Sequence, residues 1–285
     1  MPSSDPAGTA AALPAGPGLV SGGRGRALLW GVVVVNAALG LGLLLVAGDQ
    51  LTTPAPDRAW SLPASVAVAA GALAWLGVGT VGFGLTYLRR PSWDPGRALL
   101  DETEQGPAVV LVWRTAYLRR PVVLSALVMT LLAGLAVVLG SAGNAGWWVP
   151  AAAALLVLVG WPQAVARTRR PGRLVLSPQG IGVTGPDGDA WLDWDDVRGI
   201  GVVDVGWWGV LRVVGTDPAP SWRFRPRRTV LRAATPAGLW IEIPGPAVPV
   251  DPAALIRAIA RYRQDAAARA ELATEQGRRR VAGLD

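Results

Sequence analysis

Two clusters of charged side chains are the parts of this sequence that could bind a ligand or catalyse a reaction. The segment DGDAWLDWDD holds five aspartates: Asp187, Asp189, Asp193, Asp195 and Asp196. The segment WRFRPRR holds four arginines: Arg223, Arg225, Arg227 and Arg228. The chain has no histidine and no cysteine, which excludes thiol nucleophiles, disulfides and the usual ligands of zinc, copper and haem.

The aspartates do not match a calcium loop. An EF-hand loop needs oxygen ligands at its first, third and fifth positions and glycine at its sixth. Counted from Asp187, the fifth position is Trp191. Paired carboxylates for hydrolysis are an alternative, but no motif in the sequence positions a substrate beside them. We therefore expect a solvent-exposed hairpin with Leu192 and Trp194 turned inward, no metal site, no cofactor and no enzymatic activity.

The arginines offer a binding surface. In an extended segment, alternate side chains share one side, which places Arg223, Arg225 and Arg227 together. Pro226 argues against a central strand. The segment is either an ordinary solvated loop or a contact with anionic headgroups, where each basic residue contributes about 1 kcal/mol near the surface. We predict that it contacts the membrane or a partner through six residues, with the aromatic edges exposed: Trp222, Arg223, Phe224, Arg225, Arg227 and Arg228.

The elements that carry these clusters follow from composition. The 285 residues are 51% hydrophobic and 16% charged, against roughly a quarter charged in an ordinary soluble domain. Four uncharged apolar stretches are long enough for transmembrane helices, which need roughly 20 residues. They run over about 27–47, 64–88, 121–140 and 148–166. We predict a four-helix transmembrane domain over 27–166, a disordered tail over 1–26 and a loop over 89–120.

Arginine placement predicts the orientation. All 27 basic residues are arginine, and they gather before the first span, in the loop 89–120 and after the fourth span. Since basic flanks favour the cytoplasmic side, both termini and that loop should be cytoplasmic, in a bacterial inner membrane. Arg-Arg-Pro occurs where the second span ends, where the third begins and where the fourth ends. The predicted interfacial anchors are Arg89, Arg90, Trp113, Tyr117, Arg119, Arg120, Arg167, Arg169 and Arg170.

The loop 89–120 contains a pattern typical of a helix. Val109, Val112, Trp113, Ala116 and Tyr117 fall on one helical face, although the neighbouring valine and leucine spoil strict amphipathicity. This predicts an interfacial helix that leads into the third span. A surface for a partner protein is the alternative.

From Gly172 the chain reads as β-structure. About seven short runs rich in β-branched and aromatic residues are separated by turn sequences, one of them TVLRAA at 229–234. A helix then starts at Pro252, with Asp251 as its cap and Leu255, Ile259 and Tyr262 as a stripe that packs on the sheets. Large apolar residues are few beyond Gln264, which predicts a solvated distal half and a disordered tail over 277–285.

The runs LVLSPQGI and LDWDDVRGI resemble the first hairpin and third strand of the bacterial pleckstrin-homology-like (PH-like) domains found on multi-pass membrane proteins, particularly of actinobacteria. The matching residues are Leu174, Leu176, Gly180, Ile181, Trp194, Asp196 and Val197. The resemblance covers about 173–264. It implies a mainly-β PH-like barrel of about seven strands with a C-terminal helix, over 172–276, which acts as an interaction module. The turn SPQG lacks the basic residues with which lipid-binding relatives hold inositol phosphates.

Two functions remain open at this point. The first is an integral inner-membrane protein, non-enzymatic, whose cytoplasmic PH-like module binds a protein partner or the anionic membrane surface. The alternative is a small-molecule transporter or channel subunit with a regulatory PH-like domain. The absence of charged residues inside the spans favours the first. The expected partners are the lipid bilayer and an unidentified membrane or cytoplasmic protein, and we expect no nucleic acid.

Overall fold

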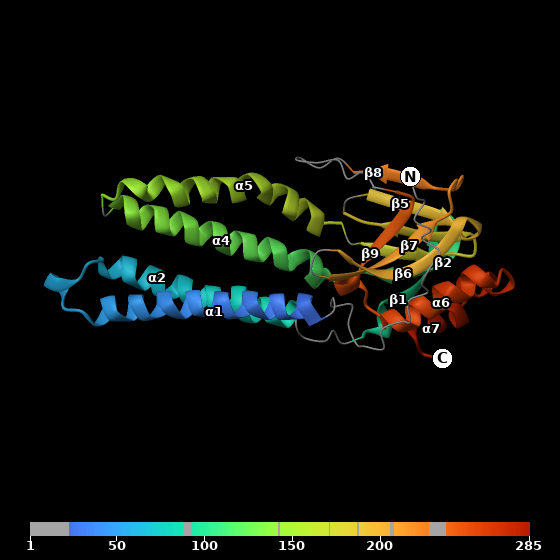
Figure 1. Cartoon of the computed structure of the whole chain (residues 1–285), viewed down its shortest axis with the longest axis horizontal. Coiled ribbons are helices and arrows are strands. Elements are labelled where there is room, and N and C mark those ends of the chain that lie inside the picture. The colour runs from blue at the N-terminus through green and yellow to red at the C-terminus, as the bar shows by residue number, and fades with distance from the viewer. Residues whose placement is uncertain are drawn as a thin grey trace, which may run out of the picture.

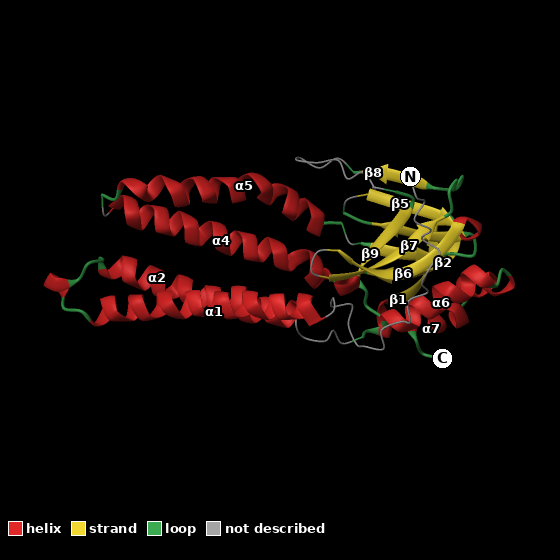
Figure 2. Ribbon diagram, in the orientation of Figure 1, coloured by secondary structure: helices red, strands yellow, loops and turns green. Residues whose placement is uncertain are grey.

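Apolar helices extend from one side of a β-rich region (Figure 1). The structure is a computed structural model of the whole chain, and it describes residues 23–87, 93–141, 143–170, 172–186, 188–205, 208–227 and 238–285. The predictions for the tail before residue 23 and for the strand at 229–234 lie outside these residues. Figure 2 shows the division of the chain into a helical end and a strand-rich end.

The helical end confirms the four predicted spans. Its helices are α1 (Gly23–Thr52), α2 (Leu62–Ala74), α4 (Thr115–Ser141) and α5 (Trp148–Thr168). The helix α2 continues through a π-helix, Trp75–Gly82, into α3 (Phe83–Tyr87). By length and composition, four segments can cross a membrane: Ala27–Thr52, Leu62–Leu85, Val122–Gly140 and Ala145–Thr168. The chain is therefore a multi-pass membrane protein.

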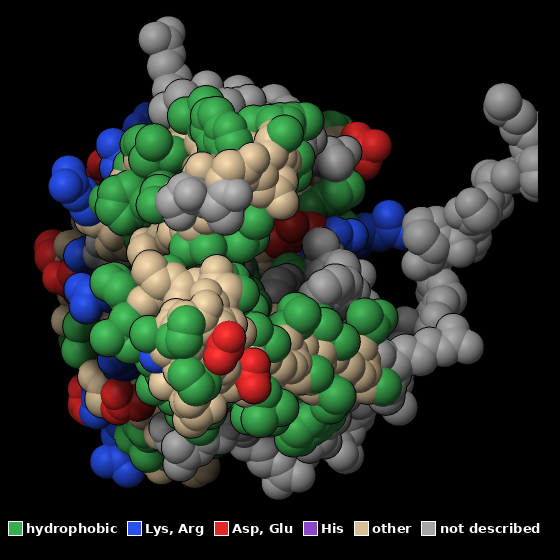
Figure 3. Space-filling view, turned by 90° about the vertical axis from the view of Figure 1, so that its left-hand side faces the viewer, with side chains coloured by type: hydrophobic (Ala, Val, Ile, Leu, Met, Phe, Trp, Pro, Cys, Tyr) green, Lys and Arg blue, Asp and Glu red, His purple; other side chains and the backbone are tan. Residues whose placement is uncertain are grey.

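The spans form two antiparallel hairpins, α1 with α2 and α4 with α5. The first is held by a close contact in which Leu76 lies against Gly40, and by the indole N–H of Trp75, which donates to the carbonyl of Asn36 at 3.1 Å. The α2 segment and its π-helix also contact α4. Seen end-on, the helical tips carry hydrophobic side chains mixed with exposed backbone and a few acidic side chains (Figure 3).

The predicted interfacial helix in the loop 89–120 is wrong. The structure has a β-hairpin there, made of β1 (Ala98–Thr103) and β2 (Gly106–Val112), with Gly106 at a φ of +87° in the turn. The apolar run that suggested a helix is a strand that is buried on both of its faces. Strand β2 pairs with β3 (Arg173–Leu176), so the β-rich region begins well before the boundary predicted at residue 172.

Two antiparallel sheets make up the β-rich region. The larger has the order β1-β2-β3-β4-β5-β8 and the smaller the order β6-β7-β9. The remaining strands are β4 (Gly180–Thr184), β5 (Gly188–Asp193), β6 (Val197–Val205), β7 (Trp208–Gly215), β8 (Arg223–Pro226) and β9 (Trp240–Pro244). Six of the seven predicted strands are thus confirmed, and β8 forms where we expected a loop.

The predicted closed barrel is wrong, because the two sheets have separate hydrogen-bond ladders. The chain leaves the first sheet after β5 through a 3₁₀ turn, Trp194–Asp196, and enters β6 in the second. Strand β8 pairs with β5 and forms one edge of the large sheet. The β1–β2 hairpin extends the sheet on its other side, where β2 pairs with β3. Both sheets contribute to one core, which includes Leu176, Trp194 and Ile243.

The C-terminal helix α6 (Pro252–Gln264) is confirmed, including its cap, where the Asp251 carboxylate accepts from the amide of Ala253 at 3.1 Å. Its distal continuation differs from the prediction. A 3₁₀ segment, Ala267–Ala273, and a further helix α7 (Glu275–Ala282) follow, and they bury Leu272 and Val281 in the core. This burial, together with the ion pair of Arg280 with Glu271 at 2.6 Å, holds a segment that we expected to be solvated or disordered.

Two neighbouring strands continue directly into two spans. Strand β2 ends at Val112 and α4 begins at Thr115, while α5 ends at Thr168 and β3 begins at Arg173. The amide of Trp113 donates to the carbonyl of Gly172 at 2.9 Å, which carries the strand pairing into the connections. The end of the large sheet at Val112 and Arg173 is therefore the end nearest the spans.

Candidate ligand-binding groove

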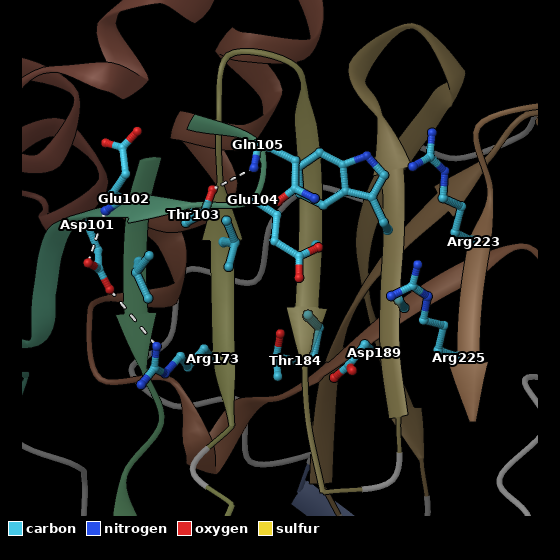
Figure 4. Close-up of a pocket in the computed structure, with 16 residues that line it drawn as sticks. Asp101, Glu102, Thr103, Glu104, Gln105, Arg173, Thr184, Asp189, Arg223 and Arg225 are labelled. Atoms are coloured by element: carbon cyan, nitrogen blue, oxygen red, sulfur yellow. Dashed lines mark hydrogen bonds and ion pairs between the residues drawn. The ribbon is translucent and has the colours of Figure 1, made fainter. Parts of the chain in front are cut away.

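A groove of about 330 Å³ crosses the outer face of the six-stranded sheet. The strand register places two rows of side chains beneath it. The row nearest the spans, here called the proximal row, contains Val112, Arg173, Thr184, Asp189 and Arg225. The second row contains Val110, Val175, Gly182, Trp191 and Arg223. The turn of the β1–β2 hairpin lies on one side of the groove and β8 on the other (Figure 4).

The floor of the groove is an indole ring laid over two glycines. A Cβ atom added to Gly182 would lie 2.4 Å from the ring of Trp191, and one added to Gly180 would lie 2.9 Å from it. The indole N–H of Trp191 donates to the carboxylate of Asp193 at 2.7 Å, which fixes the ring in its plane. Glycine is needed at both positions because any side chain there would displace the ring.

Strand β8 supplies the basic wall. Arg223 and Arg225 are exposed and project from β8 beside the groove, as Figure 4 shows. Phe224 lies between them in sequence and points to the other face, where it stacks on Trp222 with ring centroids 6.5 Å apart. The alternation predicted for the arginines is confirmed. The prediction of exposed aromatic edges is not, because Trp222 packs against the core and both rings are half-buried.

Strand β8 is held at both ends by aspartates. At its start, the Ser221 amide donates to the carboxylate of Asp196 at 2.9 Å, and the Ser221 hydroxyl accepts from the amide of Asp193 at 3.0 Å. At its end, Arg227 donates to both carboxylate oxygens of Asp189, at 2.9 and 3.0 Å. Arg223 and Arg225 lie between these fixed points. The guanidinium group of neither has a hydrogen bond or ion pair with any residue that the structure describes.

The hairpin turn supplies the acidic wall. The hydroxyl of Thr103 donates to the carbonyl of Gly106 at 2.8 Å and accepts from the amide of Gln105 at 3.2 Å, which orders the turn. Glu104 reaches from this turn over the groove (Figure 4). Among the described residues, the carboxylates of Glu102 and Glu104 have no ionic partner. Asp101, on the same side, lies 4.0 Å from Arg173.

The aspartate cluster, which we expected on a solvent-exposed hairpin, has structural partners. Asp189, Asp193 and Asp196 hold β8 and Trp191, and Asp195 pairs with Arg269 at 2.7 Å. Leu192 and Trp194 are buried, as predicted. Asp187 lies outside the described residues. Within the ranges that the structure covers, no group of three or more metal-ligating side chains occurs.

The predicted interfacial anchors have different surroundings. Arg119 on α4 and Arg167, Arg169 and Arg170 around the end of α5 are exposed. Trp113 is only 5% exposed and packs in the β core against Gly172, because it follows a strand rather than lying on an interfacial helix. Four predicted anchors have side chains outside the described part of the structure: Arg89, Arg90, Tyr117 and Arg120.

Another basic residue near the spans, Arg114, is not among the predicted anchors. Arg114 lies over the ring of Trp93, with its guanidinium carbon 5.7 Å from the ring centroid. Burial lowers the pKa of Arg114 below its usual value, and the neighbouring Arg97 lowers it further, while Asp94 opposes both effects. The amide of Arg114 also donates to the carbonyl of Ala247 at 3.0 Å, which joins the start of α4 to the β-rich region.

The acidic wall was missed as well, although the sequence carried a signal for it. The polar run DETEQG separates two apolar runs and ends in a glycine, which is typical of a hairpin turn.

Comparison with known protein families, with curated proteins and with solved structures finds no match to this chain. The structure itself establishes four candidate membrane helices joined to a mainly-β antiparallel region with C-terminal helices.

Proposed function

We propose that this chain is a non-enzymatic protein of the bacterial inner membrane that presents its β-rich region as a binding module at the cytoplasmic membrane surface. One observation carries the proposal. Strands β2 and β3 are hydrogen-bonded neighbours that continue within a few residues into α4 and α5. The large sheet is therefore a direct extension of a transmembrane hairpin and stays close to the bilayer.

The anionic membrane surface is the contact that this geometry favours. Arg225 belongs to the proximal row, and Arg169 and Arg170 are exposed in the connection from α5 to β3. Each basic residue near an anionic surface contributes about 1 kcal/mol. Arg227 adds less, because Asp189 already neutralises it. The motifs that resemble PH-like domains support a binding role, since such domains are interaction modules.

Single cysteines test the orientation, because the chain has none of its own. Cysteines at Asp57, Glu104 and Asp285 would be introduced one at a time and treated in intact cells with a maleimide that does not cross membranes. We expect labelling of Asp57→Cys in intact cells, and of Glu104→Cys and Asp285→Cys only after permeabilisation. Labelling of Glu104→Cys in intact cells would place the module outside and reject the proposal.

The membrane contact is tested in liposomes that contain the full chain. A spin label at Pro226→Cys, an exposed position at the proximal end of β8, reports the distance to the lipid surface. We expect the label to move toward the headgroups as phosphatidylglycerol is added, and to retreat in high salt or in Arg223→Gln/Arg225→Gln. The matched control is Arg257→Gln, an exposed arginine on α6. A label that ignores lipid charge contradicts the contact.

One observation favours the alternative, a transporter or channel subunit. The second span contains the π-helix Trp75–Gly82, and π-helical segments occur frequently at functional sites. Within it, the hydroxyl of Thr80 is buried without a hydrogen-bond partner among the described residues. If the spans transport a solute, Thr80→Val should change flux through liposomes that contain the full chain, with no effect on the label at Pro226→Cys.

A further inference from the structure

We propose that the groove on the outer face of the large sheet binds a small zwitterion that carries a phosphate and a primary ammonium group. The chemistry is that of an ethanolamine phosphate, whether free or as a phospholipid headgroup. The proposal rests on the proposed function only for the source of the ligand, because a module held at the bilayer meets headgroups first. The site itself is defined by its own walls and floor.

The walls of the groove carry opposite charges that no described residue compensates. On β8, the guanidinium groups of Arg223 and Arg225 have no partner among the described residues, while the next arginine along, Arg227, is paired to Asp189. Across the groove, Glu104 is likewise without an ionic partner in the part of the chain that the structure covers. Arginine is suited to phosphate because its planar fork donates two parallel hydrogen bonds.

The opposite charges select a zwitterion. A ligand with phosphate alone would be attracted by β8 and repelled by the carboxylates of the hairpin turn. A ligand with an amine alone would be attracted by the carboxylates of the hairpin turn and repelled by the arginines of β8. A ligand with both groups satisfies both walls at once, and its specificity then comes from the group that a competitor lacks.

The floor and the size of the groove fit a ligand of this kind. Trp191 belongs to the row between Gly182 and Arg223, and its ring is immobilised by Asp193 and by the glycines beneath it. An indole face packs against methylene groups and attracts an ammonium group. The volume of about 330 Å³ lies at the small end of the range for ligand pockets. It suits a ligand of headgroup size.

The walls are also fixed before any ligand arrives. Strand β8 is tied at one end through Ser221 and at the other through Arg227, and the hairpin turn is ordered by Thr103. The two arginines therefore lose little freedom other than that of their own side chains on binding, which lowers the entropic cost of association.

The test uses the full chain in a non-ionic maltoside detergent, with calorimetric titration of three probes: O-phosphoethanolamine, inorganic phosphate and ethanolamine. We expect O-phosphoethanolamine to bind at least about tenfold more tightly than either of the others. Equal affinity for inorganic phosphate would reject the ammonium half of the site. Absence of O-phosphoethanolamine binding would overturn the proposal.

Variants assign the two ends of the ligand. Arg223→Gln/Arg225→Gln should weaken the binding of O-phosphoethanolamine by about tenfold or more. In Arg223→Lys/Arg225→Lys the loss of affinity should be smaller. Glu104→Gln should leave the affinity for inorganic phosphate unchanged or raise it, and it should remove the preference for O-phosphoethanolamine. Arg257→Gln is the matched control, and an unchanged melting temperature shows that each variant is folded. Equal weakening by Arg257→Gln would mean non-specific charge binding and reject the site.

Native mass spectrometry separates the two sources of the ligand. The full chain would be mixed with equal amounts of phosphatidylethanolamine and phosphatidylglycerol in the same detergent. Retention of phosphatidylethanolamine that Glu104→Gln abolishes identifies the headgroup as the ligand, whereas binding of the free compound without lipid retention identifies a soluble one. Since these readouts do not depend on which side of the membrane the module faces, they can fail or succeed independently of the cysteine labelling.

Discussion

Leucine side chains lie in opposite environments at the two ends of this molecule. On α5, Leu156 is 76% exposed, while on α6 Leu255 is fully buried in the core of the β-rich region. Helix α5 packs mainly on α4, so most of its surface faces outward, whereas α6 is covered by strands and by α7. In the helical end apolar side chains match the lipid solvent, and in the β-rich end they form a core.

This difference teaches that hydrophobicity carries two kinds of information in one chain. A long uncharged run indicates that a helix lies in lipid, but it does not indicate which of its side chains contact other helices. Alternation in a short run indicates which side chains are buried and on which face. Substitutions of the same type should therefore have different consequences at the two ends.

Leu255→Ala and Leu156→Ala give the largest expected contrast. Removing a buried leucine side chain from a packed core costs about 2–5 kcal/mol, so Leu255→Ala should lower the melting temperature of the β-rich region strongly. Leu156→Ala exchanges one lipid-facing apolar surface for another and should cost less than about 1 kcal/mol. Thermal unfolding of the full chain in detergent measures both. Equal losses would contradict the division into a lipid-facing end and a packed end.

Val281→Ala tests whether α7 belongs to the core. Val281 is buried with Leu272, so the truncation should cost about 2 kcal/mol through lost burial and a small cavity. Leu284→Ala, at an exposed position two residues beyond the helix, is the matched control and should change little. If both variants unfold like the unmodified chain, α7 does not contribute to the stability of the β-rich region.

The C-terminal segment also shows where prediction from sequence stops. The spans, six strands and α6 were predictable because each is encoded locally, by an uncharged run, by alternation or by a cap. The helix α7 was not, because EQGRRRVA has few apolar residues and depends on a long-range contact: Arg278 donates to the carbonyl of Ala98 in β1 at 3.2 Å. Strand β2 was missed for a related reason, since a strand buried on both faces shows no alternation. Its partner β1 is mostly exposed and is recognised only through its pairing with β2.

The candidate groove was half predictable for the same reason. The alternation of Arg223 and Arg225 is a local pattern, and the sequence indicated it correctly. The opposite wall comes from a hairpin that precedes two transmembrane helices in the chain and reaches the groove only through the pairing of β2 with β3. The aspartates were noticed for their charge, yet their role in holding β8 depends on the pairing of β5 with β8.

Tyr262→Phe should alter the response of the β-rich core to alkaline pH. Burial, with a contribution from Glu271, raises the pKa of Tyr262 to about 12, and the hydroxyl is buried without a hydrogen-bond partner among the described residues. Because the folded-state pKa exceeds the unfolded value of about 10, this tyrosine's contribution is fully present below pH 10 and is lost as pH rises through 12.

The phenylalanine variant should therefore be as stable as the unmodified chain, or more so, at neutral pH, and should lose less stability between about pH 10 and 12. Denaturant unfolding of the full chain at several pH values measures both the stability at neutral pH and its loss in alkaline solution. A variant that is clearly less stable at pH 7 would show that the hydroxyl makes a contact that the core needs.

The pair of Arg227 with Asp189 should give the smallest effect on stability and the most informative one about the groove. Both side chains are partly exposed, so breaking the pair should cost about 0.2–1 kcal/mol. A double-mutant cycle with Arg227→Gln and Asp189→Asn isolates the coupling from the loss of each charge.

The same two residues fix the proximal end of β8, so the single variants should affect the groove more than they affect folding. We expect Arg227→Gln to leave the melting temperature nearly unchanged while hydrogen exchange speeds up at the Arg225 amide, which faces β5, because the edge strand opens more often without its terminal tie. Asp189→Asn should do the same, and the double variant should add little. If exchange at β8 is unchanged in all three, Ser221 and its aspartate partners hold the strand alone, and the two arginines of the groove depend on one anchor instead of two.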